Sequence, residues 1–505
     1  MLGLILTAAL TTANQGISCE ELTTLTIPET RISSSVTMPA GPFKWPEGAV
    51  APPGTNKDDP VPIPAHCRVK MVLTPTTDSE INVELWLPSE NWNNKFMAVG
   101  NGGWAGAISS YSDMKAALRR GYATAGTDTG HTGSMFSGMF ALGHPEKVID
   151  FADRSIHLMT VRAKQIIDAH YQRKINYSYY NGCSTGGRQG LMSAQRYPED
   201  FDGIIAGAPA NRHINMHVSS VTQIIRLLRN PAAAVTGTQA KLVNNAVLKQ
   251  CDTLNEGFLN NPRECRFDFS TLQCQGEARE DCLTREQLET VLTFYNGVKN
   301  SKGELIFSGS SISNPITPKL GSDAGRSYGE GTNEMLSLFL FDTVRILGFQ
   351  NPDHDWRSFD LDRDMPMIDA AAGFINAVDP DLSAYRGRGG KLLLYHGWDD
   401  PGITAENTVY YYNSVLSEMG GEQMDWMRLF LVPGMGHCRD GKGPHSFDKI
   451  SALEQWREQD IAPELILGVN PESALQRPLC PYPQYARYDG TGDLRYGGNW
   501  SCAAP

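Results

Sequence analysis

The sequence lacks the features of a membrane-spanning or nucleic-acid-binding protein. Beyond residue 13 it has no apolar run of the roughly 20 residues that a membrane helix needs. Its 56 acidic residues outnumber the 44 basic ones, and a net charge of −12 disfavours nucleic acid and anionic membranes, which bind cationic surfaces. It contains no Cys-x-x-Cys pair and its eleven histidines are scattered, which argues against zinc. We therefore expect neither a nucleic acid nor a membrane as partner.

The N-terminus lacks a basic residue but otherwise has the pattern of a secretory signal peptide. Residues 2–10 are apolar, and small residues suited to cleavage follow up to Ala13. The alternative is an apolar N-terminal strand. The even number of cysteines, ten, fits five disulfides in an exported protein. We predict a signal peptide over residues 1–13 and a secreted protein, extracellular or periplasmic.

Strand and helix patterns alternate along much of the chain. Residues 14–64 are rich in threonine, proline and serine and predict an extended segment that wraps over the core and is tied to it by a disulfide between Cys19 and Cys67. Further on, the patterns predict antiparallel edge strands at 68–73 and 81–87, core strands at 95–99, 122–127, 175–180, 201–209, 391–395 and 427–432, and helices at 114–120, 151–171 and 188–196. This alternation predicts an α/β fold with a mostly parallel sheet and helices on both faces.

A nucleophile-elbow pattern lies in the middle of this region. Gly182-x-Ser184-x-Gly186 follows a predicted strand and precedes a predicted helix, the context in which a strained turn exposes a serine hydroxyl. With 49 glycines in the chain, a plain turn is the alternative. A second glycine-rich turn, residues 100–106, follows the strand at 95–99. We expect the backbone N–H groups of Thr185 and of Gly102 or Gly103 to form an oxyanion hole.

Two later strands end in residues that complete a catalytic triad. The strand at 391–395 is followed by Asp399 and Asp400, and the strand at 427–432 by a Pro-Gly-x-Gly turn and His437. Polar residues beyond the carboxyl ends of parallel strands form the sites of α/β proteins. The order serine, aspartate, histidine is that of α/β-hydrolases, and Asp399 is the rival carboxylate.

Two cysteines lie directly beside the candidate serine and histidine, and four more lie close together in the sequence. Cys183 precedes the serine and Cys438 follows the histidine, so a disulfide between them would hold both loops together. Residues 211–387 change periodicity and predict an inserted lid between the core regions 14–210 and 388–505. Its close pairs, Cys251 with Cys265 and Cys274 with Cys282, would tie loops whose polar content is not expected to support a core of their own.

The motifs together resemble the tannase and feruloyl esterase family, which includes a mono-(2-hydroxyethyl) terephthalate hydrolase. They are, in order, GNGGWAG, TAGTDTGH, NGCSTGGRQGL, FDGIIAGAPA, YHGWDDP and VPGMGHC. The resemblance implies an α/β-hydrolase core with a large lid and a triad of Ser184, Asp400 and His437, with Asp400 rather than Asp399 in the aspartate position. It also implies the disulfides Cys19–Cys67, Cys183–Cys438, Cys251–Cys265, Cys274–Cys282 and Cys480–Cys502.

The resemblance fails at one loop. The family's lid carries a structural calcium loop rich in aspartate, whereas residues 251–262 here are three residues shorter, have Asn255 at the second aspartate position and lack the third. Asp252, Asn255 and Glu256 remain as ligand candidates. We expect no cofactor in catalysis and regard structural calcium as doubtful.

The resemblance implies a serine esterase that releases aromatic acids through an acyl-enzyme. The expected substrate is a hydroxycinnamic ester, such as a feruloyl ester, on plant cell-wall polysaccharide. Galloyl and terephthalate esters are alternatives. Arg326 is a candidate contact for the substrate's carboxylate or phenol. Two other functions remain: a transacylase with the same acyl-enzyme, and a non-catalytic binder of phenolics or polysaccharide, which predicts a broken triad.

Overall fold

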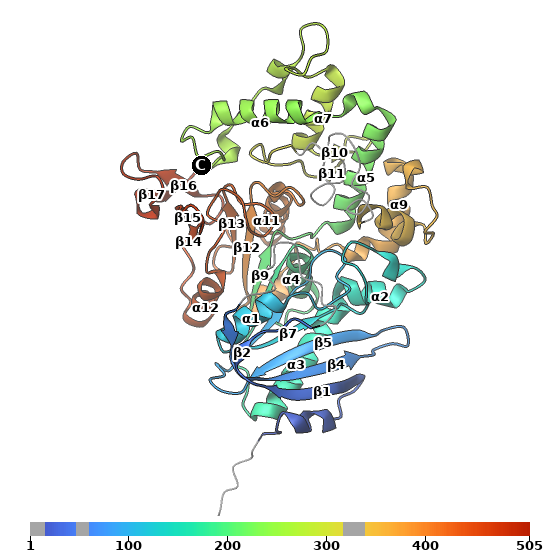
Figure 1. Cartoon of the computed structure of the whole chain (residues 1–505), viewed down its shortest axis with the longest axis vertical. Helices are drawn as coiled ribbons and strands as arrows, with labels where there is room; N and C mark the ends of the chain where they lie inside the picture. The colour runs from blue at the N-terminus through green and yellow to red at the C-terminus, as the bar shows by residue number, and fades with distance from the viewer. Residues whose placement is uncertain (1–15, 47–59, 317–338) are drawn as a thin grey trace, which may run out of the picture.

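A nine-stranded mixed sheet organises the computed structural model, which describes residues 16–46, 60–316 and 339–505 (Figure 1). Neighbouring strands from β1 to β7 pair antiparallel, and those from β7 to β13 pair parallel. The α/β fold is confirmed. In spatial order the strands are β1 (Thr30–Met38), β4 (His66–Leu73), β5 (Ile81–Pro88), β7 (Ala123–Thr127), β6 (Lys95–Val99), β8 (Tyr177–Cys183), β9 (Gly203–Gly207), β12 (Lys391–Gly397) and β13 (Met427–Val432).

The prediction that β4 and β5 lie at the edge of the sheet was wrong. The N-terminal segment, expected to be merely extended, supplies β1, which pairs along the whole of β4 and takes the edge position. The run Ser33-Ser34-Ser35 hides the hydrophobic alternation of this strand. The disulfide Cys19–Cys67, with a Cα–Cα distance of 5.6 Å, ties the segment to β4.

Helices cover both faces of the sheet. One face carries α3 (Ser155–Tyr171), α4 (Thr185–Arg196) and α11 (Ala405–Met419), and the other carries α1 (Tyr111–Arg119) and α12 (Lys449–Gln459). In β12, Leu392 and Leu394 join the first hydrophobic cluster, while Leu393 and Tyr395 join the second. Burial on both faces explains why this strand is an unbroken apolar run.

The described part of the segment between β9 and β12 is largely helical and stands beyond one end of the sheet (Figure 1). Its elements are α5 (His213–Arg229), α6 (Gly237–Cys251), α7 (Arg285–Asn296), β10 (Val298–Lys299), β11 (Leu305–Phe307), α9 (Leu361–Ala372) and α10 (Ser383–Gly387). Contrary to expectation, it has a hydrophobic core of its own, which continues to Trp104 and Phe151 of the hydrolase core. Its apolar residues are spread over several helices, so no single stretch of sequence reveals that core.

The C-terminal part adds two hairpins beside β13. They consist of β14 (Ile466–Val469) with β15 (Gln476–Leu479), and of β16 (Tyr485–Tyr488) with β17 (Trp500–Ala503). Short strands β2 (Gly41–Pro42) and β3 (Pro62–Ile63), the short helix α2 (Pro145–Ile149) and several single-turn 3-10 and π helices complete the described elements. Among the described residues, no helix combines the length and apolarity needed to cross a membrane.

The sheet register brings the carboxyl ends of five parallel strands, β6, β8, β9, β12 and β13, to the same end of the sheet. Val99 at the end of β6 pairs with Asn181 of β8, and Cys183 at the end of β8 pairs with Gly207. On the far side of β9, Gly397 at the end of β12 pairs with Val432. The loops that carry the candidate site residues therefore leave the sheet at the same end.

Candidate active site

Ser184 occupies a strained turn between β8 and α4. Its φ of 66° and ψ of −124° lie outside the regions that most residues adopt. A Cβ atom at Gly182 would lie 2.7 Å from the carbonyl carbon of Gly186, so the close approach of these two backbones requires glycine. Ser184 itself is only half-buried, although the helix that follows it is buried. This is the geometry of a nucleophile elbow.

The glycine-rich turn after β6 packs directly against this elbow. The Thr185 hydroxyl donates a hydrogen bond of 2.7 Å to the Gly103 carbonyl oxygen, and the Gly186 N–H donates one of 2.7 Å to Asn101. Thr185 is the first residue of α4, where a helix leaves N–H groups without an intrahelical partner. Gly103 has a φ of +57° and, like Gly102, is half-buried. The backbones expected to form the oxyanion hole thus lie side by side.

Asp400 and His437 form a hydrogen-bonded pair. His437 Nδ1 lies 2.7 Å from Asp400 Oδ2, with the carboxylate fully buried and the imidazole 34% exposed. Burial alone would raise the pKa of Asp400, but the charge of His437 and the hydrogen bonds from His396 and His437 lower it. Burial would lower the pKa of His437, and the charge of Asp400 together with the hydrogen bond raises it instead. The lowered pKa of Asp400 favours an ionised carboxylate that accepts a hydrogen bond from His437.

Asp399 has a different partner. It accepts a hydrogen bond of 2.6 Å from the hydroxyl of Ser313, which lies in the segment between β9 and β12, and burial raises its pKa to about 7. The next residue of that segment, Asn314, donates through Nδ2 to the Asp400 carbonyl oxygen at 2.7 Å. The two neighbouring aspartates therefore make different contacts, and the segment between β9 and β12 contacts the aspartate loop directly.

A disulfide joins the serine loop to the histidine loop. Cys183 and Cys438 are bonded with a Cα–Cα distance of 6.0 Å, across 255 positions of sequence. The Gly436 N–H donates to the Asp440 carbonyl oxygen at 3.1 Å and closes a turn that carries His437 and Cys438. The other bonded pairs are Cys19–Cys67, Cys251–Cys265, Cys274–Cys282 and Cys480–Cys502, the pairs that the resemblance implies.

The sequence matches the family model described as tannase and feruloyl esterase over residues 67–503. The chain belongs to the tannase and feruloyl esterase family. An uncharacterized esterase of Xanthomonas campestris pv. campestris is 35% identical to it, covering 98% of this chain and 92% of the relative. A probable feruloyl esterase B-1 of Aspergillus fumigatus is 33% identical, covering 86% of this chain and 85% of the relative. The crystal structure of feruloyl esterase B from Aspergillus oryzae superimposes with a TM-score of 0.84 at 29% identity, covering 96% of this chain and 100% of that one.

Membership of the tannase and feruloyl esterase family confirms the resemblance found in the motifs and makes the protein a carboxylic ester hydrolase with an α/β-hydrolase fold. Five disulfides within the described residues are typical of proteins that fold in an oxidising compartment and act outside the cell.

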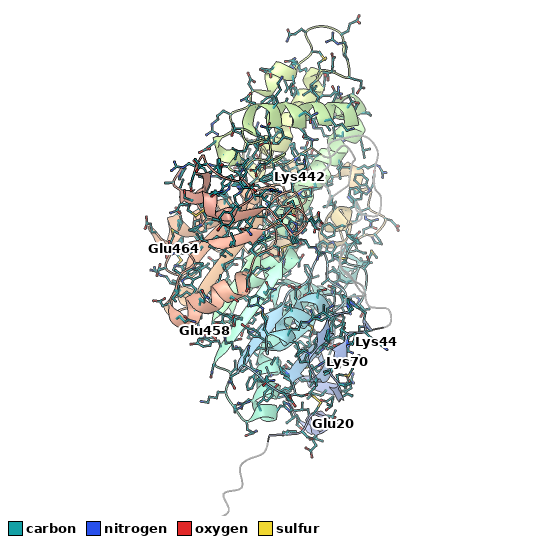
Figure 2. All side chains as sticks on the ribbon, turned by 60° about the vertical axis from the view of Figure 1, so that its left-hand side comes forward. Glu20, Lys44, Lys70, Lys442, Glu458 and Glu464 are labelled. Carbon is teal, nitrogen blue, oxygen red and sulfur yellow. A yellow bond between two sulfur atoms is a disulfide. The ribbon has the colours of Figure 1, made fainter. Side chains whose placement is uncertain are left out.

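The loop that corresponds to the family's calcium site is held by groups of the protein itself. Both Asp252 oxygens accept backbone N–H groups, from Glu256 and Gly257. Glu256 pairs with the fully buried guanidinium of Arg477 at 2.5 Å. Lys442, labelled in Figure 2, donates to the Gly257 carbonyl oxygen at 3.3 Å and so joins the C-terminal part to the segment between β9 and β12. A calcium ion does not fit beside this buried guanidinium, because the two cations would repel each other with little solvent between them.

The histidines are not all scattered, because His213 and His217 lie four positions apart on α5, the spacing of two zinc ligands on one face of a helix. Both imidazoles are fully buried around Trp104, and His217 Nδ1 lies 2.6 Å from the Thr343 hydroxyl. Burial lowers the pKa of both. Across residues 16–46, 60–316 and 339–505, no group of three or more potential ligands could hold a metal ion. Arg326, the candidate contact for the substrate's carboxylate or phenol, lies outside the described residues.

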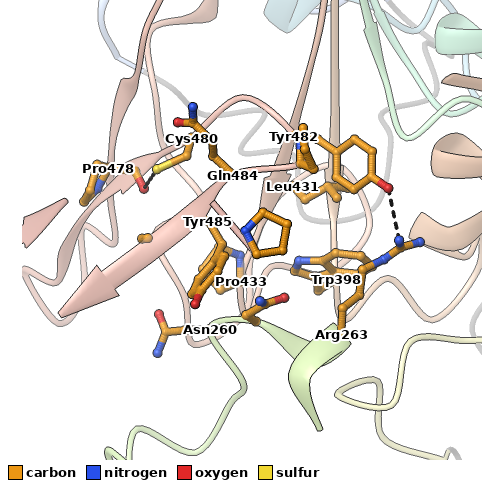
Figure 3. A pocket seen from close by; sticks show the side chains of 14 residues that line it. Asn260, Arg263, Trp398, Leu431, Pro433, Pro478, Cys480, Tyr482, Gln484 and Tyr485 are labelled. Atoms are coloured by element: carbon orange, nitrogen blue, oxygen red, sulfur yellow. Dashed lines mark hydrogen bonds between the residues drawn. The ribbon is translucent and has the colours of Figure 1, made fainter. Parts of the chain in front are cut away.

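Trp398 lines a recess of about 220 Å³ whose lining includes none of Ser184, Asp400 and His437 (Figure 3). The recess lies between the segment that joins β9 to β12, the strand β13 and the C-terminal hairpins. In it, Arg263 donates to the Tyr482 hydroxyl at 3.0 Å and also pairs with Glu406 at 2.5 Å. The recess therefore belongs to the packing between this segment and the C-terminal part of the chain.

Proposed function

We propose that this protein is a secreted serine esterase that hydrolyses esters of hydroxycinnamic acids, such as ferulic acid, through an acyl-enzyme. The observation that carries the proposal is the hydrogen bond between His437 and Asp400 in a loop that a disulfide ties to the elbow of Ser184. The feruloyl substrate is supported by the names of the two Aspergillus relatives.

In the proposed mechanism, the Ser184 hydroxyl attacks the ester carbonyl while Nε2 of His437 takes its proton. A serine hydroxyl is a weak nucleophile at neutral pH, so it needs this base. Asp400 holds the imidazole with Nε2 free of hydrogen and stabilises the imidazolium that forms. The N–H groups of Thr185 and of Gly103 or Gly102 stabilise the oxyanion. His437 then protonates the leaving alcohol, and water hydrolyses the acyl-enzyme by the same steps.

The lid provides the acid pocket in this proposal, because it is the segment that lies against the aspartate loop. The alcohol part is proposed to be a plant cell-wall polysaccharide, and galloyl esters remain the alternative substrate within the same family. We also propose that residues 1–13 are an export signal and that no metal ion is needed, since Arg477 and Lys442 supply positive charge at the shortened loop.

The test is the initial rate of hydrolysis of methyl ferulate, methyl p-coumarate, methyl gallate and mono-(2-hydroxyethyl) terephthalate, with Ser184→Ala as the blank. We expect the cinnamates to be preferred and the variant to be inactive. Preference for gallate would keep the mechanism and change the substrate. Activity that survives in Ser184→Ala, or a folded wild-type protein without activity on any ester, would contradict the triad. Product analysis with an added alcohol acceptor separates hydrolysis from acyl transfer.

A further inference from the structure

A second histidine contacts the carboxylate of Asp400. His396 Nε2 lies 3.1 Å from Asp400 Oδ2, the same oxygen that His437 contacts, and both side chains are completely buried. Asp400 Oδ1 accepts the backbone N–H groups of Gly402 and Ile403, each at 2.9 Å. The carboxylate therefore has four donors, of which the two on Oδ2 are imidazoles.

The hydrogen-bond partners of His396 determine its tautomer. Nε2 also lies 2.8 Å from the carbonyl oxygen of Ile403, which can only accept a hydrogen bond. The ionised Asp400 can only accept as well, so Nε2 must carry a hydrogen. Nδ1 lies 2.7 Å from the Thr408 hydroxyl on α11, a group able to donate to it. The hydrogen on Nε2 is thus shared between the Ile403 carbonyl oxygen and Asp400 Oδ2, while Nδ1 can accept from Thr408.

We infer that His396 is a positioning residue for the triad, which fixes the carboxylate of Asp400 so that Oδ2 faces His437. This inference rests on the proposed function. The backbone N–H groups hold only Oδ1, so without His396 the position of Oδ2 would depend on its contact with His437 alone. The Nε2–H of His396 supplies the second anchor, on Oδ2. Thr408 acts one step further away, because its hydroxyl keeps the hydrogen of His396 on the nitrogen that faces Asp400.

Two substitutions of His396 are expected to differ in their effect on the rate. His396→Leu removes the donor, whereas the side-chain amide of His396→Gln can place an N–H near the position of Nε2. One hydrogen bond to a charged group corresponds to about 10- to 100-fold in rate. We expect His396→Leu to lower kcat by that factor with KM nearly unchanged, and His396→Gln to recover most of the loss. Thr408→Val, which keeps the shape of the side chain, should lower kcat by a smaller factor.

Two further measurements distinguish positioning from a merely structural role. When Asp400 loses its orientation, its contact with His437 weakens, so the acid limb of the kcat/KM profile should move to lower pH in His396→Leu. The low-field proton resonance of the hydrogen between His437 Nδ1 and Asp400 should move upfield or disappear. His396→Gln should retain both features of the wild type.

The result that overturns the inference is a folded His396→Leu or Thr408→Val variant with the kcat, acid limb and low-field resonance of the wild type. A lower melting temperature with those three unchanged also overturns it, because it assigns His396 to packing alone. Equal losses in His396→Leu and His396→Gln would show that the donated hydrogen is not what matters. Activity in Ser184→Ala would instead contradict the proposed function itself, whatever the His396 variants do.

Discussion

Removing the disulfide between Cys183 and Cys438 should impair catalysis and stability together. The bond closes a loop of 255 positions and links the residue before Ser184 to the residue after His437. The chain-entropy model gives about 5.5 kcal/mol of stabilisation for a loop of that length, as an upper figure. Alanine at both positions avoids a new hydroxyl beside the nucleophile.

The effect on rate follows from geometry. Without the bond, the serine and histidine loops keep only weaker contacts, and a displacement of about 1 Å in a catalytic group costs about 100-fold. We expect Cys183→Ala with Cys438→Ala to lower kcat by about that factor, measured on methyl ferulate well below the melting temperature of the variant. Circular dichroism at the assay temperature establishes that the variant is folded.

The disulfide Cys480–Cys502 provides a matched control. It closes a loop of 22 positions in the C-terminal hairpins, for which the same model gives about 3.4 kcal/mol. Alanine at both of these positions should lower the melting temperature and leave kcat near that of the wild type. If the Cys183 and Cys438 variant also retains kcat while losing only stability, the argument that this bond aligns the triad is refuted.

Other predictions concern charge. The pKa of His437 is raised above the usual value of about 6.5, and only the neutral ring can act as the base. In a pH profile, kcat/KM should therefore decrease as the pH is lowered through this raised pKa. Asp400→Asn should lower kcat by about 10⁴-fold, whereas Asp399→Asn should cost less than about tenfold; equal losses would contradict the assignment. EDTA should leave the melting temperature unchanged, and a large decrease would show that a structural calcium ion is bound after all. Glu256→Gln should destabilise the fold by about 3–5 kcal/mol, because it leaves the buried guanidinium of Arg477 without its charged partner.

Most of the hydrolase core could be predicted from the sequence because its signals are local. The strands that are buried on both faces are short apolar runs, and the elbow is a fixed spacing of glycines around Ser184. The edge strand β1 was missed because its central serines carry no hydrophobic period. The core of the lid was missed because its apolar residues come from helices that are far apart in the sequence.

The sequence by itself determined the order serine, aspartate, histidine, the cysteines beside the serine and the histidine, and the family. The motif resemblance already favoured Asp400 over Asp399, but only the tertiary structure showed that Asp399 contacts Ser313 of the inserted segment and that His396 shares the Asp400 carboxylate with His437. It also showed that the buried Arg477 pairs with Glu256 in the shortened loop, although the two residues are 221 positions apart in the sequence. The reason is physical: spacing along the chain places residues on a strand or a turn, but the partner of a buried charge depends on which distant segments pack against it.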